Sequence, residues 1–214
     1  MPSEDTIGFK SQFGQDRYVL ERFFPNRRKG YFVEIGTVDG VDLSNTWYFE
    51  QVLGWDGLLI DASPRYCELA ARQRRATVVN CALADTEGRM LFLDAGYVGG
   101  LLRFMPPRQI LEIEYYEGPK QKPIGVFWVD TKRLDSVLST QGVTRIDYLS
   151  VDIEGAEPQI LSTLDFGKVS VGVITVEAKG DAIHAIHAIL EPAGFVMEGM
   201  VEADAVFVHR SFRG

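Results

Sequence analysis

The stretch DYLSVDI, residues 147–153, is nearly continuous in apolar and β-branched side chains, and so is VGVITV, residues 171–176. Runs of this kind are typical of parallel strands that are covered on both faces. Shorter runs at 31–35, 57–60 and 77–81 each end in turn or helix-starting residues. Because strands alternate with helix-like segments, we expect right-handed βαβ units and a doubly wound α/β sheet.

Four segments combine helix-starting residues with the apolar spacing of amphipathic helices. They are residues 44–53, 64–75, 155–164 and 181–191. Ser44 and Asn45 are expected to cap the first, and Ser63 the second, where Pro64 suits the first helical turn. Further short strands are expected at 90–93, 195–200 and 205–209. Arg72, Arg74 and Arg75 end the second helix, where cations complement its dipole; a docking patch is the minor alternative.

The length of 214 residues fits one large domain or two small ones. We expect an N-terminal helical segment over 1–30 and one main domain over 31–210. Residues 95–125 are rich in glycine, proline and aromatic side chains but show no clear period. A segment of this length favours a lid or an insertion that packs on the sheet.

The excess of acidic side chains in the chain limits the kinds of partner and ligand that it can bind. The chain has 30 acidic and 22 basic side chains, a formal charge of −8, whereas nucleic-acid binding needs a basic surface. Residues 146–209 alone carry 11 acidic and 2 basic side chains, so a ligand bound there should be neutral or cationic. We therefore expect no nucleic-acid partner.

The apolar stretches are far shorter than the roughly 20 residues that span a bilayer, so no membrane partner is expected. The opening residues 1–12 lack the apolar core of a secretory signal. Cys67 and Cys81 are too few for a disulfide scaffold or a structural zinc site, and reduced thiols favour a cytoplasmic protein. Homo-oligomerisation is left open.

Ligands of open α/β sheets bind beyond the carboxyl ends of the strands, so the residues that follow each strand are candidates. The first strand ends in EIGTVDG, residues 34–40, where Gly36 and Gly40 permit close backbone approach. Val38 stands where the central glycine of a dinucleotide loop would fall, and an ordinary turn explains this loop about as well. Asp61 ends the second strand, as a ribose-binding carboxylate or as a helix-capping residue.

Two further strand ends carry chemistry. Residues 82–85 place small side chains and Asp85 where a flat ring could lie, although Asp85 also suits a turn. The run SVDIEGAE, residues 150–157, presents three acids at the end of a very apolar strand. Carboxylates placed so closely repel one another unless a cation, a hydroxyl or an amine lies between them. We favour a functional role for Asp152 and Glu154, and a helix-starting role for Glu157.

The residues at these strand ends indicate the chemistry of the ligand that would bind there. Asp61 suits a ribose, residues 82–85 suit a flat ring, and Glu34, Asp39 and Asp152 suit a positive or amino-bearing end. The chain has no glycine-rich phosphate loop with its lysine. S-adenosylmethionine meets all these conditions, whereas NAD and ATP fit poorly.

Longer stretches carry a family resemblance, in order and spacing, over roughly residues 11–210. They are SQFGQD (11–16), YFVEIGTVDGVDLSNTWYFE (31–50), GWDGLLIDASPRYCEL (54–69), VVNCALADTEG (78–88), IDYLSVDIEGAEPQIL (146–161) and DAVFVHR (204–210). Together they resemble the FkbM family of S-adenosylmethionine-dependent methyltransferases. The resemblance implies a Rossmann-like class I methyltransferase fold, with a seven-stranded, mostly parallel sheet, an antiparallel last strand and helices on both faces. It also implies methyl transfer to a hydroxyl of a small-molecule, sugar or polyketide-like acceptor.

The resemblance implies a role for each matching position. The methionine end of the cofactor would contact Glu34, Gly36, Asp39 and Gly40, and the ribose would contact Asp61, beside Ala62. The adenine would contact Ala84 and Asp85. Asp152 and Glu154 would face the junction of cofactor and acceptor, with Asp152 also contacting the cofactor. In the family the fifth strand is often followed by Glu-His or Glu-Asn, whereas here Glu177-Ala178-Lys179 follows.

Catalysis would be an in-line displacement helped by a carboxylate base, with Asp152 the first candidate, then Glu154 and Glu177. A divalent metal ion at Asp152 and Glu154 is an alternative that we do not favour, so no metal is expected. Tyr115, Tyr116 and Trp128 are candidates for an acceptor lid, with core packing as the alternative. The competing functions are a cofactor-binding but inactive partner or regulatory domain, and a nucleotide-sugar-binding protein.

Overall fold

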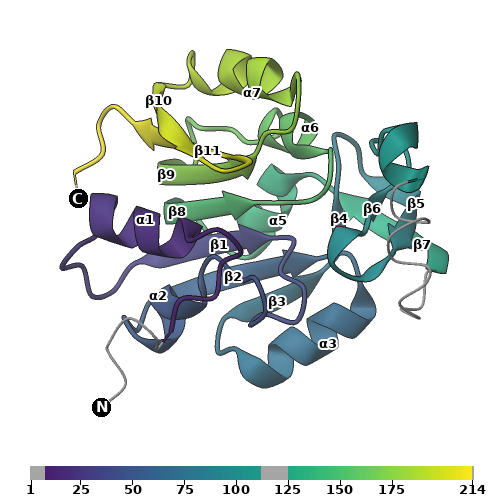
Figure 1. Ribbon diagram of the computed structural model, residues 1–214, viewed down its shortest axis with the longest axis horizontal. Helices are drawn as coiled ribbons and strands as arrows, with labels where there is room; N and C mark the ends of the chain where they lie inside the picture. The colour runs from purple at the N-terminus through teal and green to yellow at the C-terminus, as the bar shows by residue number, and fades with distance from the viewer. Residues whose placement is uncertain (1–7, 112–124, 214) are drawn as a thin grey trace.

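Seven strands form the main sheet of the computed structural model, which describes residues 8–111 and 125–213 (Figure 1). In chain order they are β1 (Tyr31–Ile35), β2 (Asp56–Asp61), β3 (Thr77–Asn80), β8 (Arg145–Val151), β9 (Ser170–Glu177), β10 (Phe195–Val201) and β11 (Asp204–His209). Their spatial order is β10-β11-β9-β8-β1-β2-β3. The first five pair in parallel, whereas β11 runs antiparallel to both β9 and β10. The predicted seven-stranded, mostly parallel sheet with an antiparallel last strand is confirmed.

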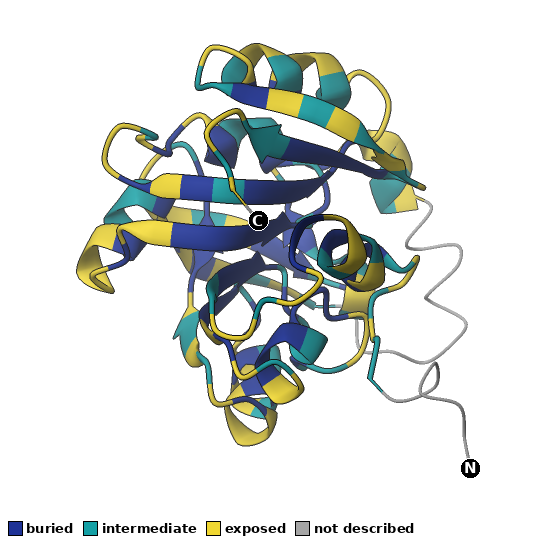
Figure 2. Ribbon diagram, turned by 90° about the vertical axis from the view of Figure 1, so that its left-hand side faces the viewer, coloured by how far each residue is buried: buried dark blue, intermediate teal, exposed yellow. Residues whose placement is uncertain are grey.

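Helices α1 (Gln15–Phe23), α2 (Trp47–Gln51) and α3 (Pro64–Gln73) cover one face of this sheet. Val19, Phe49 and Ala70 from these helices pack in one buried cluster with Phe32 and Tyr148 of the sheet. Figure 2 shows the central strands of the main sheet mostly buried, the edge strand β10 partly exposed, and exposed residues on the outer sides of the helices.

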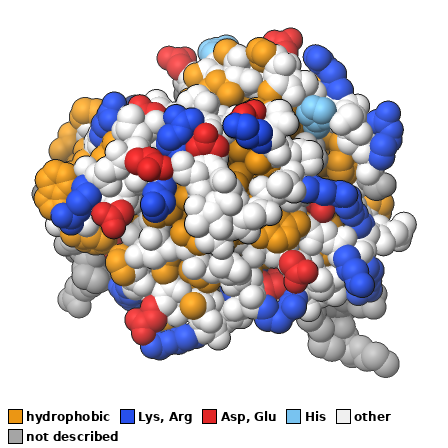
Figure 3. Space-filling model, turned by 180° about the vertical axis from the view of Figure 1, so that it is seen from behind, with side chains coloured by type: hydrophobic (Ala, Val, Ile, Leu, Met, Phe, Trp, Pro, Cys, Tyr) orange, Lys and Arg blue, Asp and Glu red, His pale blue; other side chains and the backbone are white. Residues whose placement is uncertain are grey.

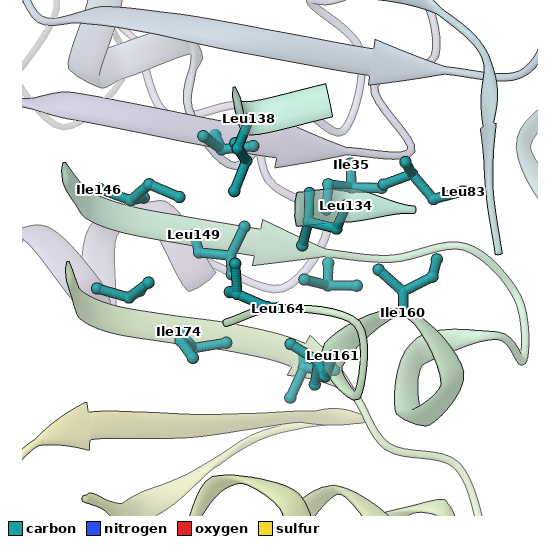
Figure 4. Packing of buried hydrophobic residues seen from close by; sticks show 14 of the residues in the cluster. Ile35, Leu83, Leu134, Leu138, Ile146, Leu149, Ile160, Leu161, Leu164 and Ile174 are labelled. Carbon is teal, nitrogen blue, oxygen red and sulfur yellow. The ribbon is translucent and has the colours of Figure 1, made fainter. Parts of the chain in front are cut away.

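Helices α5 (Leu134–Thr140), α6 (Glu157–Leu161) and α7 (Ala182–Leu190) cover the opposite face. Leu138, Ile160 and Ile186 pack there against Leu149 and Ile174 of the sheet (Figure 4). Helices therefore lie on both faces, as predicted. Among the described residues no helix is both long and apolar enough to cross a membrane.

A second sheet, which the sequence analysis missed, lies between β3 and α5 in the chain. Its strands are β4 (Ala82–Leu83), β5 (Gly88–Asp94), β6 (Gly100–Leu101) and β7 (Gly125–Lys132), in the order β4-β7-β5-β6. Only the strand at 90–93 was predicted, and β7 was not. The antiparallel pairing of β5 with β7 joins residues about 40 positions apart, such as Leu91 with Trp128. A local sequence pattern cannot predict a pairing between residues so far apart.

The described part of residues 95–125 is ordered around this sheet. It contains a 3₁₀ turn η2 (Gly96–Val98), strand β6 and a helical turn at 107–111, and it buries Leu101 and Met105. Tyr115 and Tyr116 lie outside the described residues. Trp128 is 57% exposed on β7 and neither fills the core nor lines the cavity described below.

Two local predictions had different outcomes. Ser63 caps α3 by accepting a hydrogen bond from the Tyr66 backbone N–H, with Pro64 in the first turn, as predicted. Helix α2 begins at Trp47, and Ser44 and Asn45 are not its caps. Both bind the carboxylate of a buried acid instead, as the site shows.

Candidate active site

A cavity of about 450 Å³ opens beyond the carboxyl ends of β1, β2, β8 and β9. Its volume lies in the range of small-molecule sites, and its place is the one that open α/β sheets use for ligands. The predicted site residues that line it are Glu34, Gly36, Asp61, Ala62, Asp152, Glu154 and Glu177.

Four predicted residues lie outside the lining of the cavity: Asp39, Gly40, Ala84 and Asp85. The Asp39 carboxylate accepts hydrogen bonds from the backbone N–H groups that follow it in its own turn. Gly40 packs against Arg74 and Ala84 is fully buried, while Asp85 lies 3.6 Å from the Arg103 guanidinium. Of residues 82–85, which are expected to lie against a flat ring, Ala82 and Leu83 line the cavity and Ala84 and Asp85 do not.

Gly36 brings two strand ends into contact. It adopts φ 81°, and a Cβ on it would lie 1.7 Å from the backbone oxygen of Asp152. Only glycine fits such an approach. Gly36 lines the cavity, and its close neighbour is the backbone after β8. Gly36 therefore fixes the position of Asp152 relative to β1.

Asp61 joins the ends of β1 and β2. Its carboxylate accepts hydrogen bonds from the backbone N–H groups of Thr37 (2.9 Å), Val38 (3.0 Å) and Ser63 (2.8 Å). Burial raises the pKa of Asp61 to about 6 despite these donors. A carboxylate offers about four acceptor positions, so room remains for a ligand hydroxyl. Since Ser63 caps α3 with its own hydroxyl, Asp61 is not the side chain that caps the helix.

Glu34 is buried and binds the start of α2. Its two oxygens accept hydrogen bonds from the Ser44 hydroxyl (2.9 Å), the Asn45 backbone N–H (2.6 Å) and the Thr46 hydroxyl (2.6 Å). Burial raises its pKa, against the lowering effect of Arg74, whose guanidinium lies 3.7 Å away. Glu34 thus borders the cavity while its carboxylate holds the loop that follows β1.

Arg74 is the centre of this network, a role beyond the predicted one at the end of α3, and its burial excludes it from a docking patch. Its side chain is fully buried, forms an ion pair with Glu50 and donates to the Gly40 carbonyl (2.7 Å) and to the Thr46 hydroxyl (3.0 Å). One sequence signal could have revealed it. Arg74 follows Cys67 and Ala70 at the spacing of the buried face of α3.

Three carboxylates meet at the ends of β8 and β9. Oxygens of Asp152, Glu154 and Glu177 lie within 4.8 Å of one another. The ammonium of Lys179 lies 2.9 Å from Glu154 Oε2 and 2.8 Å from Glu177 Oε1, and the Gln109 amide also donates to Glu154. The Asp152 carboxylate accepts no hydrogen bond from any described residue. We call these four charged residues, Asp152, Glu154, Glu177 and Lys179, the acid cluster.

The electrostatics of the acid cluster follow from burial and crowding. Burial, then the charges of Glu177 and Glu154, raises the pKa of Asp152 well above its usual range. Burial, then Glu154, raises the pKa of Glu177 to about 7, against the opposing effect of Lys179. Its two carboxylate partners raise the pKa of Lys179, which therefore stays charged. Perturbed carboxyl groups in a cavity are typical of reactive sites.

The turn after β8 holds the acids in place. The strand ends at Val151, two residues earlier than predicted, so Asp152 belongs to the turn. Glu154 has φ 60°, a conformation that is unfavourable for a side chain other than glycine and is typical of functional sites. Glu157 accepts hydrogen bonds from the backbone N–H groups of Ile153 and Gly155, both at 3.1 Å. The helix-starting role predicted for Glu157 fits these contacts.

The N-terminal segment SQFGQD, residues 11–16, also borders the cavity, a role that the sequence analysis did not assign. Gln12, Phe13 and Gln15 line the cavity, and the Gln15 amide donates to Asp204 at 2.9 Å. The charge of Asp204 contributes to the raised pKa of Asp152, so this segment lies on the side of the acid cluster.

The lining of the cavity has an acidic part and an apolar part. Seven acidic side chains face the cavity, and Lys179 is the one basic side chain among the described lining residues; the acids are Glu34, Asp42, Asp61, Asp94, Asp152, Glu154 and Glu177. The apolar part comes from Ile60, Ala82, Leu83, Phe92 and Leu101. On the face seen in Figure 3, basic side chains are interspersed with acidic and uncharged ones and form no continuous surface.

A cavity at the carboxyl edge of a doubly wound sheet is the ligand site of Rossmann-like domains, and here it has an acid at the end of β2 and no phosphate loop. Residues 34–197 match the methyltransferase FkbM domain. The chain therefore belongs to this family of S-adenosylmethionine-dependent methyltransferases, as the resemblance indicated. No curated protein sequence matches the chain significantly.

Several solved structures are distantly similar. A TehB-like S-adenosylmethionine-dependent methyltransferase from Corynebacterium glutamicum is 13% identical, with 94% of this chain and 89% of that chain covered and a TM-score of 0.48. TrmK of M. capricolum, in complex with S-adenosylhomocysteine, is 9% identical, with 92% and 68% covered and a TM-score of 0.42. A precorrin-6y C5,15-methyltransferase from Geobacter metallireducens is 12% identical, with 90% and 85% covered and a TM-score of 0.45.

Proposed function

We propose that this methyltransferase transfers the methyl group of S-adenosylmethionine to a hydroxyl of a small-molecule acceptor, of sugar or polyketide-like chemistry. One observation carries the proposal. The Asp152 carboxylate faces the cavity without a hydrogen-bond donor, while its neighbours Glu154 and Glu177 are both bound to Lys179. An accessible carboxylate with a raised pKa is suited to accept the proton of an attacking hydroxyl.

The residues present fit the cofactor. Asp61 retains acceptor capacity for a ribose hydroxyl, and the apolar wall of Ala82, Leu83 and Phe92 suits the adenine ring beside Ala62. The seven acids of the lining suit a ligand that carries a sulfonium and an ammonium group. Glu34 and Gly36 border the methionine end in this arrangement.

When bound, S-adenosylmethionine supplies an electrophilic methyl group on a positively charged sulfur. Asp152 would accept the proton of the acceptor hydroxyl as the methyl group moves from sulfur to the acceptor oxygen, and the cofactor would leave as S-adenosylhomocysteine. A positioned base contributes roughly 10²–10⁴-fold, and holding the acceptor hydroxyl in one orientation within the cavity would supply much of the remaining rate.

The rim of the cavity indicates the chemistry of the acceptor. Phe13, Leu43 and Tyr97 line the cavity and are 46%, 39% and 43% exposed. Their loops are joined, because Ser11 pairs with Leu43 and the Tyr97 hydroxyl contacts Asp42. An acceptor with an apolar or ring face would cover these side chains. The acids beneath the rim favour a neutral or cationic acceptor over an anionic one.

Thermal unfolding with S-adenosylhomocysteine, S-adenosylmethionine, NADH and ATP, each added separately, tests the cofactor. A true ligand at 100 times its dissociation constant stabilises the fold by about 2.7 kcal/mol. We expect this effect from the two sulfur compounds only, and stabilisation by NADH or ATP alone would contradict the assignment. Transfer of labelled methyl to a panel of hydroxylated sugars and polyketides then tests the reaction. Binding without transfer to any acceptor would favour the inactive partner domain instead.

A further inference from the structure

Lys179 holds an unusual place in the cavity. Among the described residues that line it, Lys179 is the one basic residue, whereas seven are acidic. Its side chain is 57% exposed, yet its ammonium contacts Glu154 and Glu177 within 2.9 Å. Holding a long, half-exposed side chain in one geometry costs conformational entropy, so the two carboxylates must stabilise it there.

The spacing of the carboxylates is the spacing that a cation requires. One oxygen each from Asp152, Glu154 and Glu177 lie within 4.8 Å of one another. Hard divalent ions such as Mg²⁺ and Ca²⁺ bind carboxylate oxygens in clusters of this kind. Here an ammonium group on the chain itself already lies beside two of the three carboxylates.

We propose that Lys179 is a positioning residue that acts as the internal counter-cation of Asp152, Glu154 and Glu177, in the place of a divalent ion. Its ammonium group neutralises one of the three carboxylate charges and holds Glu154 and Glu177 in place. Asp152 then remains the carboxylate that an acceptor hydroxyl can reach. Methyl transfer then needs no added metal. This inference rests on the proposed function for its catalytic consequence, but not for its effect on ion binding.

The neighbours of the cluster support this division of roles. Gln109 donates to Glu154 from the segment after β6, and Glu157 is occupied by backbone N–H groups of its own turn. Asp204, the nearest acid on β11, is bound by Gln15. No described residue other than Lys179 brings a positive charge to Glu154 or Glu177. Removal of that charge should leave a cluster that recruits a cation from solution.

The test compares Lys179→Met with Lys179→Arg, and with Lys168→Met as the matched control. Lys168 pairs with Asp165 at 3.1 Å on the surface, where its side chain is 83% exposed. Thermal unfolding is followed while MgCl₂ or CaCl₂ is titrated into each protein. We expect stabilisation of Lys179→Met that saturates, with half of the effect on the order of 10⁻³ M, the range of weak carboxylate sites. The wild type, Lys179→Arg and Lys168→Met should not respond.

Methyl-transfer kinetics of the same variants provide the second test. We expect Lys179→Met to lose about 10- to 100-fold in kcat, the cost of a misplaced reacting group, with little change in KM for the cofactor. Lys179→Arg should recover part of kcat, and a chelator should not affect the wild type. If Lys179→Met does not fold, Lys179→Gln provides the same comparison with a polar side chain.

Two results would overturn the inference. One is stabilisation of the wild type by Mg²⁺, or its inactivation by a chelator. Either result would mean that a metal ion, and not Lys179, is the counter-cation of the three carboxylates. The other is a folded Lys179→Met protein that gains no response to ions and keeps its kcat. Failure of the proposed function is distinguishable, because the wild type would then either not be stabilised by S-adenosylhomocysteine or transfer no methyl group to any acceptor, while the ion titration would still report on Lys179.

Discussion

Two regions of this methyltransferase place one basic side chain between two glutamates. Arg74 lies between Glu34 and Glu50 beneath the first loop, and it is fully buried. Lys179 lies between Glu154 and Glu177 at the cavity, where its side chain is more than half exposed. The chemistry of the two arrangements is alike, but their surroundings differ.

The difference separates a structural network from a reactive one. Around Arg74 the carbonyl of Gly40 and the hydroxyls of Ser44 and Thr46 complete the hydrogen bonds of the guanidinium. A buried network of charges is stable only when its members are satisfied in this way. Around Lys179 a third carboxylate, that of Asp152, remains without a donor and faces the cavity. An unsatisfied group of this kind costs stability and provides reactivity.

The largest expected effect is on stability, at Arg74. Arg74→Met leaves Glu34 buried without a counter-charge and leaves Glu50 only the exposed Arg75 guanidinium, 3.7 Å away, which costs about 3–5 kcal/mol. Denaturant unfolding measures it. Arg72→Ala is the matched control from the same helix, because its pair with Glu68 is exposed and should contribute at most about 0.5 kcal/mol. Equal losses in the two variants would remove the distinction between the regions.

The next effect is on activity, at Asp152. Asp152→Asn removes the base and should lower kcat by about 10²-fold or more. The same change should leave the free energy of unfolding at pH 7 unchanged or higher, because burial and crowding disfavour the ionised Asp152 carboxyl and raise its pKa. Methyl-transfer kinetics and denaturant unfolding test the two parts. A variant with full turnover would exclude Asp152 as the base.

The pH dependence should separate activity from stability. Glu177 has a pKa raised from 4.5 to about 7, and Asp152 is also shifted upward, so the cluster takes up protons as pH falls through about 7. We expect kcat to decrease by up to about tenfold per pH unit below that value. A raised carboxyl pKa stabilises the fold at low pH, and this contribution is lost as pH rises through about 7. Activity should therefore fall with acid before the fold does, as pH–rate profiles and unfolding curves will show.

The smallest effect is expected at Asp85, which lies outside the cavity lining. Asp85→Asn should change the affinity for S-adenosylhomocysteine by less than about twofold, because this carboxylate faces Arg103. Asp61→Asn should weaken the same affinity by roughly tenfold, the value of one hydrogen bond to a charged group. Calorimetric titration measures both. An equal loss at Asp85 would restore its predicted contact with the adenine.

Local patterns predicted the strands and their ends well. The apolar runs located β1, β2, β8 and β9 within about two residues, and the turn residues after them located Gly36, Asp61 and Asp152. Strand ends are predictable because side-chain burial and turn chemistry act over a few neighbouring residues. Asp39, Gly40, Ala84 and Asp85 were assigned from their positions after strands and from the family resemblance, but the path of a loop depends on packing that a motif does not contain.

The sequence by itself determined the doubly wound sheet, the helices on both of its faces and the edge where the acids gather, because these follow from local periodicity. The tertiary structure alone decided what each charge does. It buried Arg74 against Glu34, 40 residues away in the chain, and brought Lys179 to Glu154 across 25 residues. It also paired β5 with β7 and Gly36 with the backbone of Asp152. Such contacts depend on how distant segments of the chain pack together. Their energies depend on both residues of a pair, and no local sequence pattern shows which two residues will meet.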